Sequence, residues 1–211
     1  MAWLLGYISA DGCIRPDRYE IKIKSIDYEM LSHAQKILNT NYSIKPEKNS
    51  RCFVLSFYGK RLVEDIQKYG ITARKSLTLK MPEIPDDYFW DFLRGVVDGD
   101  GHIIPPHSQD SGEVRFQITS SKQFLEKLLK ILGIKIDCPK YKLSPRGKAF
   151  ELKINSSYAY QCLFFMYYNE KYGLSRKKNI ALRLISNFEK STYAKDRRRT
   201  IINKCRQAII N

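Results

Sequence analysis

The sequence predicts an α+β protein made of two halves that share one order of elements and are related by an approximate twofold axis. The first observation is a motif that occurs twice, as WLLGYISADGCI at residues 3–14 and as FLRGVVDGDGHI at residues 92–103. The second is that each copy precedes a strand pattern running into a helix pattern, at residues 19–38 and 114–132. Because these correspondences recur in the same order, they indicate an internal duplication.

Each half is expected to run helix, strand, strand, helix, strand, strand, helix. The motifs supply the first helix, over residues 3–12 in the first half. Apolar and polar residues alternate at 19–25 and 113–119, which is typical of a strand with one buried face. Apolar residues then recur with the helical period at Met30, Leu31 and Ala34, and at Phe124, Leu125, Leu128, Leu129 and Leu132. The stretches 53–76 and 150–179 also resemble each other and complete the two halves.

Residue types at the ends of the second helices predict where those helices start and stop. Asp27 is suited to cap the N-terminus in the first half, and Ser120 or Ser121 the matching N-terminus in the second. Gly133 follows the last apolar position of the second-half helix, so it is expected to end that helix.

The segment KMPEIPDD at residues 80–87 separates the halves, because its prolines and mixed charges are typical of a linker. The predicted organisation is therefore a first repeat at 1–80, a linker at 81–87 and a second repeat at 88–186. Residues 187–211 form a basic extension whose apolar positions predict a terminal helix packed back on the body.

Composition limits the classes of partner. The formal net charge is +15, which favours a polyanion, with nucleic acid ahead of an anionic membrane surface. No apolar run approaches the roughly 18 residues of a membrane span, so no membrane association is expected. The five cysteines form no C-x-x-C pair, which favours a reduced protein inside the cell, in the cytoplasm or nucleoid or in an organelle.

Small residues four positions apart predict how the two motif helices meet. Gly6 and Ala10 share one helix face in the first copy, and Gly95 and Gly99 share the same face in the second. Small residues with this spacing allow two helix backbones to approach closely. We therefore expect the two helices to pack along these faces and to form the joint between the halves.

Asp11 and Asp100 end the two motif helices and should lie close together at this joint. Carboxylates at adjacent helix C-termini repel each other, and the negative helix ends add to the repulsion. A cation relieves this, and oxygen ligands favour Mg²⁺, for which Mn²⁺ can substitute. Gly12 and Gly101 follow and are expected to adopt left-handed conformations that turn the chain. Asp98 has Ser9 as its counterpart, so it is expected to be a structural acid, with a basic side chain as one candidate partner.

The segments LLGYISADG (4–12) and LRGVVDGDG (93–101) resemble the two signature helices of the LAGLIDADG homing endonucleases. The similarity covers about residues 3–186 and fits the single-chain, two-motif members. It implies two αββαββα halves whose sheets form a saddle over double-stranded DNA. It also implies a monomeric, intron-encoded enzyme that cuts both strands of a long asymmetric site, leaving short 3′ overhangs. The alternative is an intron-splicing maturase or a cleavage-inactive DNA-binding protein on the same scaffold, with intron RNA as a further candidate partner.

The resemblance also suggests roles for individual residues. Asp11 and Asp100 would be the catalytic metal ligands, helped by the backbone carbonyls of Ala10 and Gly99. A basic catalytic residue near the end of each half would be Lys75 and Lys177, with Lys178 as the alternative to Lys177. A polar active-site residue after the first long strand is less defined, and the candidates are Ser25, Ser120 or Ser121, with Lys24 and Thr119 as neighbours.

DNA would be read by the outward faces of the strands and by the loops at their ends. The loops expected to reach the outer parts of the site are 15–18, 46–51, 105–112 and 144–148. Side chains of this surface that suit bases or phosphates are Glu20, Lys22, Lys24, Lys45, Lys48, Arg51, Arg115, Gln117, Thr119, Lys140, Lys142, Arg146 and Lys153.

Overall fold

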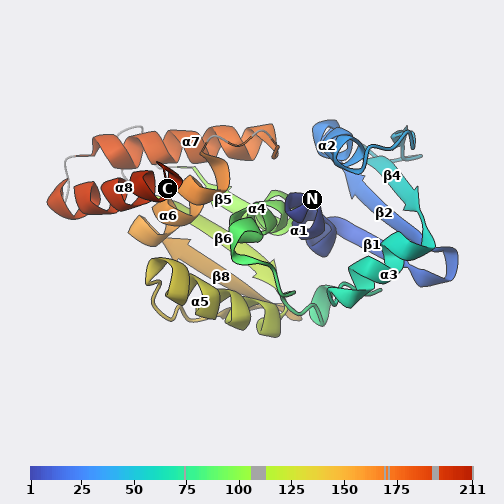
Figure 1. The fold of residues 1–211 in the computed structure, drawn as a ribbon, viewed down its shortest axis with the longest axis horizontal. Helices are drawn as coiled ribbons and strands as arrows, with labels where there is room; N and C mark the ends of the chain where they lie inside the picture. Colours follow the sequence, from blue (N-terminus) through green and yellow to red (C-terminus); the bar gives the residue numbers. More distant parts are fainter. Residues whose placement is uncertain (74, 106–112, 169, 171, 192–194, 211) are drawn as a thin grey trace.

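The structure is a computed structural model that describes residues 1–73, 75–105, 113–168, 170, 172–191 and 195–210. Figure 1 shows two sheets on either side of a central pair of helices. The first half contains α1 (Ala2–Asp11), β1 (Gly12–Arg15), β2 (Glu20–Ser25), α2 (Tyr28–Leu38), β3 (Lys45–Pro46), β4 (Phe53–Tyr58) and α3 (Lys60–Lys68). The second contains α4 (Phe89–Asp100), β5 (Gly101–Ile104), β6 (Arg115–Ser120), α5 (Lys122–Ile136), β7 (Ser144–Arg146), β8 (Ala149–Asn155) and α6 (Ser156–Tyr167). The helices α7 (Ser175–Lys190) and α8 (Lys195–Ile210) follow.

The predicted α+β class and the order of elements in each half are confirmed. Both sheets are antiparallel and have the same topology, β1-β2-β4-β3 in the first half and β5-β6-β8-β7 in the second. Short 3₁₀ turns lie at Pro16–Arg18, Lys75–Leu77 and Asp86–Tyr88.

One face of each sheet is apolar and lies in the core. Ile21 pairs with Phe57 in the first sheet, Ile118 pairs with Leu152 in the second, and all four side chains are buried. The alternate positions of the same strands carry the polar side chains. Because side chains alternate between faces along a strand, each sheet presents one polar face that is built from the residues expected to read DNA.

The helices α1 and α4 form the joint through their glycines, as predicted. A Cβ atom on Gly6 would lie 2.0 Å from the carbonyl oxygen of Phe92, and one on Gly95 would lie 2.0 Å from that of Trp3. A Cβ on Gly99 would lie 2.5 Å from the Cβ of Ala10. The two backbones therefore approach closely at Gly6 and Gly95, the backbone of Gly99 lies against the Ala10 side chain, and the C-terminal ends of the helices lie side by side.

The roles predicted for three glycines, Gly12, Gly101 and Gly133, are wrong. Gly12 and Gly101 have φ of −74° and −82°, so they are extended rather than left-handed, because each motif helix continues directly into a strand. The structure needs glycine there because a Cβ would lie 2.6 Å from the carbonyl oxygen of Ile8 or of Val97. Gly133 does not end α5, which continues to Ile136 and is followed by Asp137 with φ of 52°.

The C-terminal helices cover the outer side of the second half (Figure 1). Helix α7 runs to Lys190, so the boundary predicted between residues 186 and 187 falls inside a helix. Helix α8 buries Cys205, and the guanidinium of Arg198 lies 4.4 Å from the centre of the Phe188 ring. Within the described part of the chain, none of the helices combines the length and the apolar character that crossing a membrane requires.

Candidate active site

Asp11 and Asp100 lie where the C-termini of α1 and α4 meet. The position of a Cβ on Gly99 is 3.3 Å from Oδ2 of Asp11, so the Asp11 carboxylate lies against the backbone that leads into Asp100. Both residues reach solvent. The surrounding protein nevertheless removes part of their hydration, which together with the charge of Asp100 raises the pKa of Asp11 to about 6. The loss of hydration also raises the pKa of Asp100.

The chemistry of this site fits a divalent cation with a small number of protein ligands. Among the described residues, no group of three or more histidine, cysteine, aspartate or glutamate side chains could hold a metal ion. The side chains available as metal ligands at the joint are thus the two carboxylates, which lie beside the backbones of Ala10 and Gly99. Mg²⁺ commonly binds one or two carboxylates and completes its shell with water and substrate phosphates. An exposed pair of acids that repel each other matches that mode.

The two predicted lysines are buried beneath the ends of the motif helices. Nζ of Lys75 donates a hydrogen bond to the carbonyl oxygen of Gly12. Nζ of Lys177 donates to the carbonyl oxygens of Val97 at 2.7 Å and of Asp98 at 2.8 Å, with a weaker contact to Gly99 at 3.4 Å. Burial lowers the pKa of Lys75, and it lowers that of Lys177 to about 8.

Each lysine therefore places a positive charge at the negative end of a motif helix, beside the paired acids. Lys178, the alternative to Lys177, donates instead to the carbonyl oxygen of Glu170. The structure thus brings Lys75 and Lys177 to the joint and leaves Lys178 outside it.

The candidate polar residues are held in local contacts. Oγ of Ser25 accepts a hydrogen bond from the backbone of Asp27. Oγ of Ser121 accepts from the amide of Phe124 and donates to the carbonyl oxygen of Leu79, so Ser121 caps α5 as predicted. Asp27 does not cap α2 with its side chain, contrary to the prediction. Lys24 pairs with Glu47, and Thr119 lies on the polar sheet face opposite Glu151.

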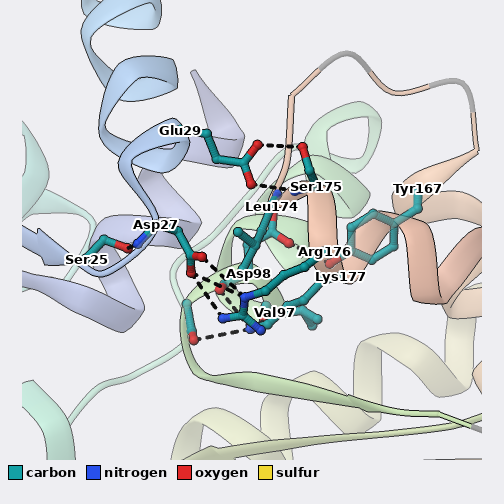
Figure 2. Close-up of polar contacts among 11 residues, drawn as sticks. Ser25, Asp27, Glu29, Val97, Asp98, Tyr167, Leu174, Ser175, Arg176 and Lys177 are labelled. Atoms are coloured by element: carbon teal, nitrogen blue, oxygen red, sulfur yellow. Dashed lines mark hydrogen bonds and ion pairs between the residues drawn. The ribbon is translucent and has the colours of Figure 1, made fainter. Parts of the chain in front are cut away.

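Asp98 is a buried acid that joins the two halves. It accepts hydrogen bonds from Nε1 of Trp3 at 2.8 Å, from the hydroxyl of Tyr167 at 2.7 Å and from the amide of Leu174 at 3.2 Å. These donors are neutral, and among the described residues no basic side chain donates a hydrogen bond to the Asp98 carboxylate. Figure 2 shows Asp98 beside the start of α7, and burial raises the pKa of its carboxyl group.

We expect the substitution Asp98→Ala to destabilise the protein strongly. It would leave three buried donors without an acceptor, and such groups each cost about 1–3 kcal/mol, so the expected loss is about 3–5 kcal/mol of unfolding free energy. Urea denaturation would measure it, with Asp98→Asn expected to lose less. The matched control is Asp86→Ala, whose carboxylate is 90% exposed. Equal stability of the Asp98→Ala and Asp86→Ala proteins would contradict this role.

The predicted DNA-reading residues lie on the polar faces of the sheets and on the adjoining edges. A hollow of about 290 Å³ on the first sheet is lined by Glu20, Lys22, Lys45 and Tyr58, among others. On the second sheet Gln117 pairs with Lys153. Exposed positions near the β3 and β7 edges are taken by Lys48, Arg51, Lys140, Lys142 and Arg146. Residues 106–112 of the predicted loop 105–112 lie outside the described residues.

Glu20 differs from its neighbours because its carboxylate is nearly buried within the polar face. Nη1 of Arg15 lies 3.4 Å from it, and the Tyr58 hydroxyl donates to it at 3.3 Å. Burial opposes ionisation, but the hydrogen bonds from Ser56 and Tyr58 and the charge of Arg15 hold its pKa below the usual value. The side chain is therefore a fixed, ionised acceptor in a basic surface.

The fold of this chain is similar to that of two-domain LAGLIDADG structures. Residues 1–69 match the family model described as a LAGLIDADG-like domain, which confirms the resemblance seen in the motifs. The second half repeats the same topology around the second motif.

Solved structures with the same fold include several meganucleases. The chain resembles meganuclease I-AabMI bound to uncleaved DNA, with a TM-score of 0.59, 14% identity and coverage of 94% of this chain and 96% of the other. It resembles meganuclease I-SmaMI bound to DNA equally, with a TM-score of 0.59, 14% identity and coverage of 98% and 97%. The N-terminal LAGLIDADG domain of DUF199/WhiA gives a TM-score of 0.57, 17% identity and coverage of 85% of both chains. No curated protein matches the sequence.

The residues that connect α2 to the start of α7 were not predicted from the sequence. Asp27 and Glu29 of the first half bind Arg176 and Ser175 of the second. The sequence carried one signal: Asp27 and Glu29 correspond to Ser121 and Gln123 in the aligned repeat, so the acids occur in one half alone. Their partners could not be found without the tertiary structure.

Proposed function

We propose that this protein is a divalent-metal-dependent endonuclease that cuts both strands of double-stranded DNA at a long, asymmetric site. The observation that carries the proposal is the pair of exposed carboxylates, Asp11 and Asp100, brought together between two basic polar sheet faces. Mg²⁺ bound there would activate water and stabilise the leaving oxygen of the phosphodiester. The relatives bound to DNA, one of them in the presence of calcium ions, support the same assignment.

The candidate active-site residues would have different roles in cleavage. Asp11 and Asp100 would hold the metal, with Ala10 and Gly99 supplying backbone oxygens. Lys75 and Lys177 would place positive charge near the phosphate undergoing reaction, where charge develops in the transition state. The polar faces differ between the halves, so the target is expected to be asymmetric. A monomer encoded within an intron, acting inside the cell and leaving 3′ overhangs, completes the proposal.

Cleavage of a defined plasmid tests this function. The substrate is a supercoiled plasmid that carries the joined sequences flanking the reading frame, incubated with Mg²⁺, Mn²⁺ or EDTA. Linear DNA with Mg²⁺ or Mn²⁺ and none with EDTA is expected. Tight binding to this DNA without cutting under any metal would favour a cleavage-inactive DNA-binding protein. Tight binding to the intron RNA without cutting would favour a maturase.

We expect Glu20 to influence one base position of the target by holding Arg15, because the Glu20 carboxylate is only 5% exposed and is bound by Arg15 and Tyr58. An arginine held in the major groove suits guanine, and a good contact of this kind contributes about 1–3 kcal/mol of discrimination. Glu20→Gln should therefore lose preference at one position while the others are retained. A panel of targets with every single-base change would show this, with Glu64→Gln on α3 as the control. An unchanged profile for Glu20→Gln would contradict the assignment.

A further inference from the structure

Five consecutive residues before and at the start of α7 contact three separate parts of the molecule. Gly173 has φ of 151°, and a Cβ there would lie 3.3 Å from Oδ2 of Asp98. The amide of Leu174 donates to the same carboxylate at 3.2 Å. Gly173–Lys177, here called the α7 turn, is therefore anchored on the buried acid that also binds Trp3 of the first half.

The middle of the α7 turn is bound by the first half. The amide of Ser175 donates to Oε1 of Glu29 at 2.9 Å, and the Ser175 hydroxyl donates to the other oxygen of Glu29. Nη2 of Arg176 lies 3.1 Å from Oδ2 of Asp27. Figure 2 shows both acids reaching from the start of α2 to the start of α7. We call these four side chains the interhalf latch.

The next residue of the turn is Lys177, whose ammonium group lies at the end of α4. Its amide donates to the carbonyl oxygen of Leu174 at 2.9 Å, so its backbone is part of the same turn. Its Nζ reaches the carbonyl oxygens of Val97 and Asp98. The interhalf latch therefore fixes the backbone from which the lysine side chain extends.

The other lysine is supported differently. The segment after Lys75 is fixed by the hydroxyl of Ser121, which donates to the carbonyl oxygen of Leu79. That contact is neutral and buried, whereas the Arg176 and Asp27 side chains are 56% and 23% exposed. The halves thus hold each other's lysine-bearing segments reciprocally. Among the contacts of the described residues, the support of the Lys177 segment includes an ion pair, whereas that of the Lys75 segment is a neutral hydrogen bond.

We propose that Asp27 and Glu29 are positioning residues of the first half that place Lys177 of the second half for the cleavage of one DNA strand. This inference rests on the proposed nuclease function. Exposed ion pairs contribute little to global stability, so losing the latch should loosen the α7 turn without unfolding the protein. A small displacement of an active-site group is enough to slow a reaction strongly. The strand served by Lys177 should then be cut more slowly than the strand served by Lys75.

The double variant Asp27→Asn with Glu29→Gln tests the proposal in two separate measurements. Amide hydrogen exchange of the free protein should show faster exchange across residues 173–178, by about tenfold or more, at an unchanged melting temperature. Single-turnover cleavage of the plasmid described above should show one strand slowed by about 10–100-fold, with unchanged DNA binding. The strand that stays uncut should be the same strand that stays uncut with the Lys177→Met variant. With the Lys75→Met variant, the other strand should stay uncut.

Two further variants serve as control and rescue. Glu64→Gln with Asp65→Asn removes the same charge from exposed ion pairs on α3 and should change neither measurement. The charge exchange Asp27→Arg with Arg176→Asp should restore most of the slowed cleavage relative to Asp27→Arg alone. A purely structural latch would slow both strands equally, and that result would overturn the proposal.

The exchange measurement separates this inference from the nuclease assignment. If the wild-type protein cuts no DNA, the proposed function fails, and the positioning role fails with it. Faster hydrogen exchange in the latch variant would in that case still show that the latch orders the α7 turn. If the wild-type protein cuts and the latch variant cuts both strands normally, the positioning role alone is overturned. Unchanged exchange at 173–178 would also overturn it.

Discussion

Replacing either Asp11 or Asp100 by asparagine is expected to abolish double-strand cleavage while leaving DNA binding intact. The amide keeps the size of the side chain but removes the charge that would hold a divalent cation in the proposed site. Loss of one electrostatic group of this kind costs about 10²–10³-fold in rate, and loss of a metal ligand should reach the upper end of that range. Because both acids lie at one joint, each single variant should stop the cutting of both strands.

The measurement is single-turnover cleavage of the plasmid, together with the binding of a labelled duplex in the presence of Ca²⁺. Asp137→Asn is the matched control, because this acid is 84% exposed at the far end of α5 and pairs with Lys204. The Asn variants should bind at least as tightly as the wild type, since each removes a negative charge near the phosphates. Wild-type cleavage rates in both variants would refute the assigned roles of Asp11 and Asp100.

Gly95→Ala is expected to destabilise the protein strongly, and Gly6→Ala should have a similar effect because its added Cβ would lie equally close to a backbone oxygen. The Cβ added at Gly95 would lie 2.0 Å from the carbonyl oxygen of Trp3 and 2.8 Å from the amide of Tyr7, and neither backbone atom can rotate away. Overpacking a tight interior commonly costs about 1–3 kcal/mol and occasionally more. A loss of about 3 kcal/mol lowers the melting temperature of a chain of this size by roughly 6–12 °C.

Gly133→Ala provides a control of opposite sign. Gly133 lies within α5, where an added Cβ meets its nearest atom at 3.5 Å, an ordinary contact. The same substitution inside a helix should raise stability by up to about 1 kcal/mol, because alanine has the higher helix propensity. Thermal unfolding of the two variants should therefore move in opposite directions. A Gly95→Ala protein as stable as the wild type would show that α1 and α4 can separate without loss.

The sequence by itself determined the fold class, the order of elements and the joint. Those features are local or periodic: strand alternation places Ile21 and Ile118 in the core, and the small residues Gly6 and Gly95 leave room for a neighbouring backbone. The repeated Asp-Gly at the ends of the motifs also located Asp11 and Asp100, because a duplicated signal is far more specific than a single turn motif.

Other assignments needed the tertiary structure. The sequence predicted left-handed caps at Gly12 and Gly101. Their conformation instead depends on the strand that follows and on contacts with Ile8 and Val97. Sequence also left Lys177 and Lys178 as alternatives, since adjacent residues point to different sides of a helix. Only the position of the start of α7 beside the end of α4 directs Lys177 to the joint and Lys178 to Glu170.

The polar side-chain contacts between the halves were decided by the tertiary structure alone. Asp27 and Arg176 are separated by 149 positions, and Trp3 and Asp98 by 95. Hydropathy periods and capping preferences describe residues that are close along the chain, so they cannot predict pairs that are this far apart in sequence. Asp98, which is buried and accepts three hydrogen bonds, and Asp27, which binds Arg176 of the other half, are the same residue type, and only their surroundings in space distinguish them.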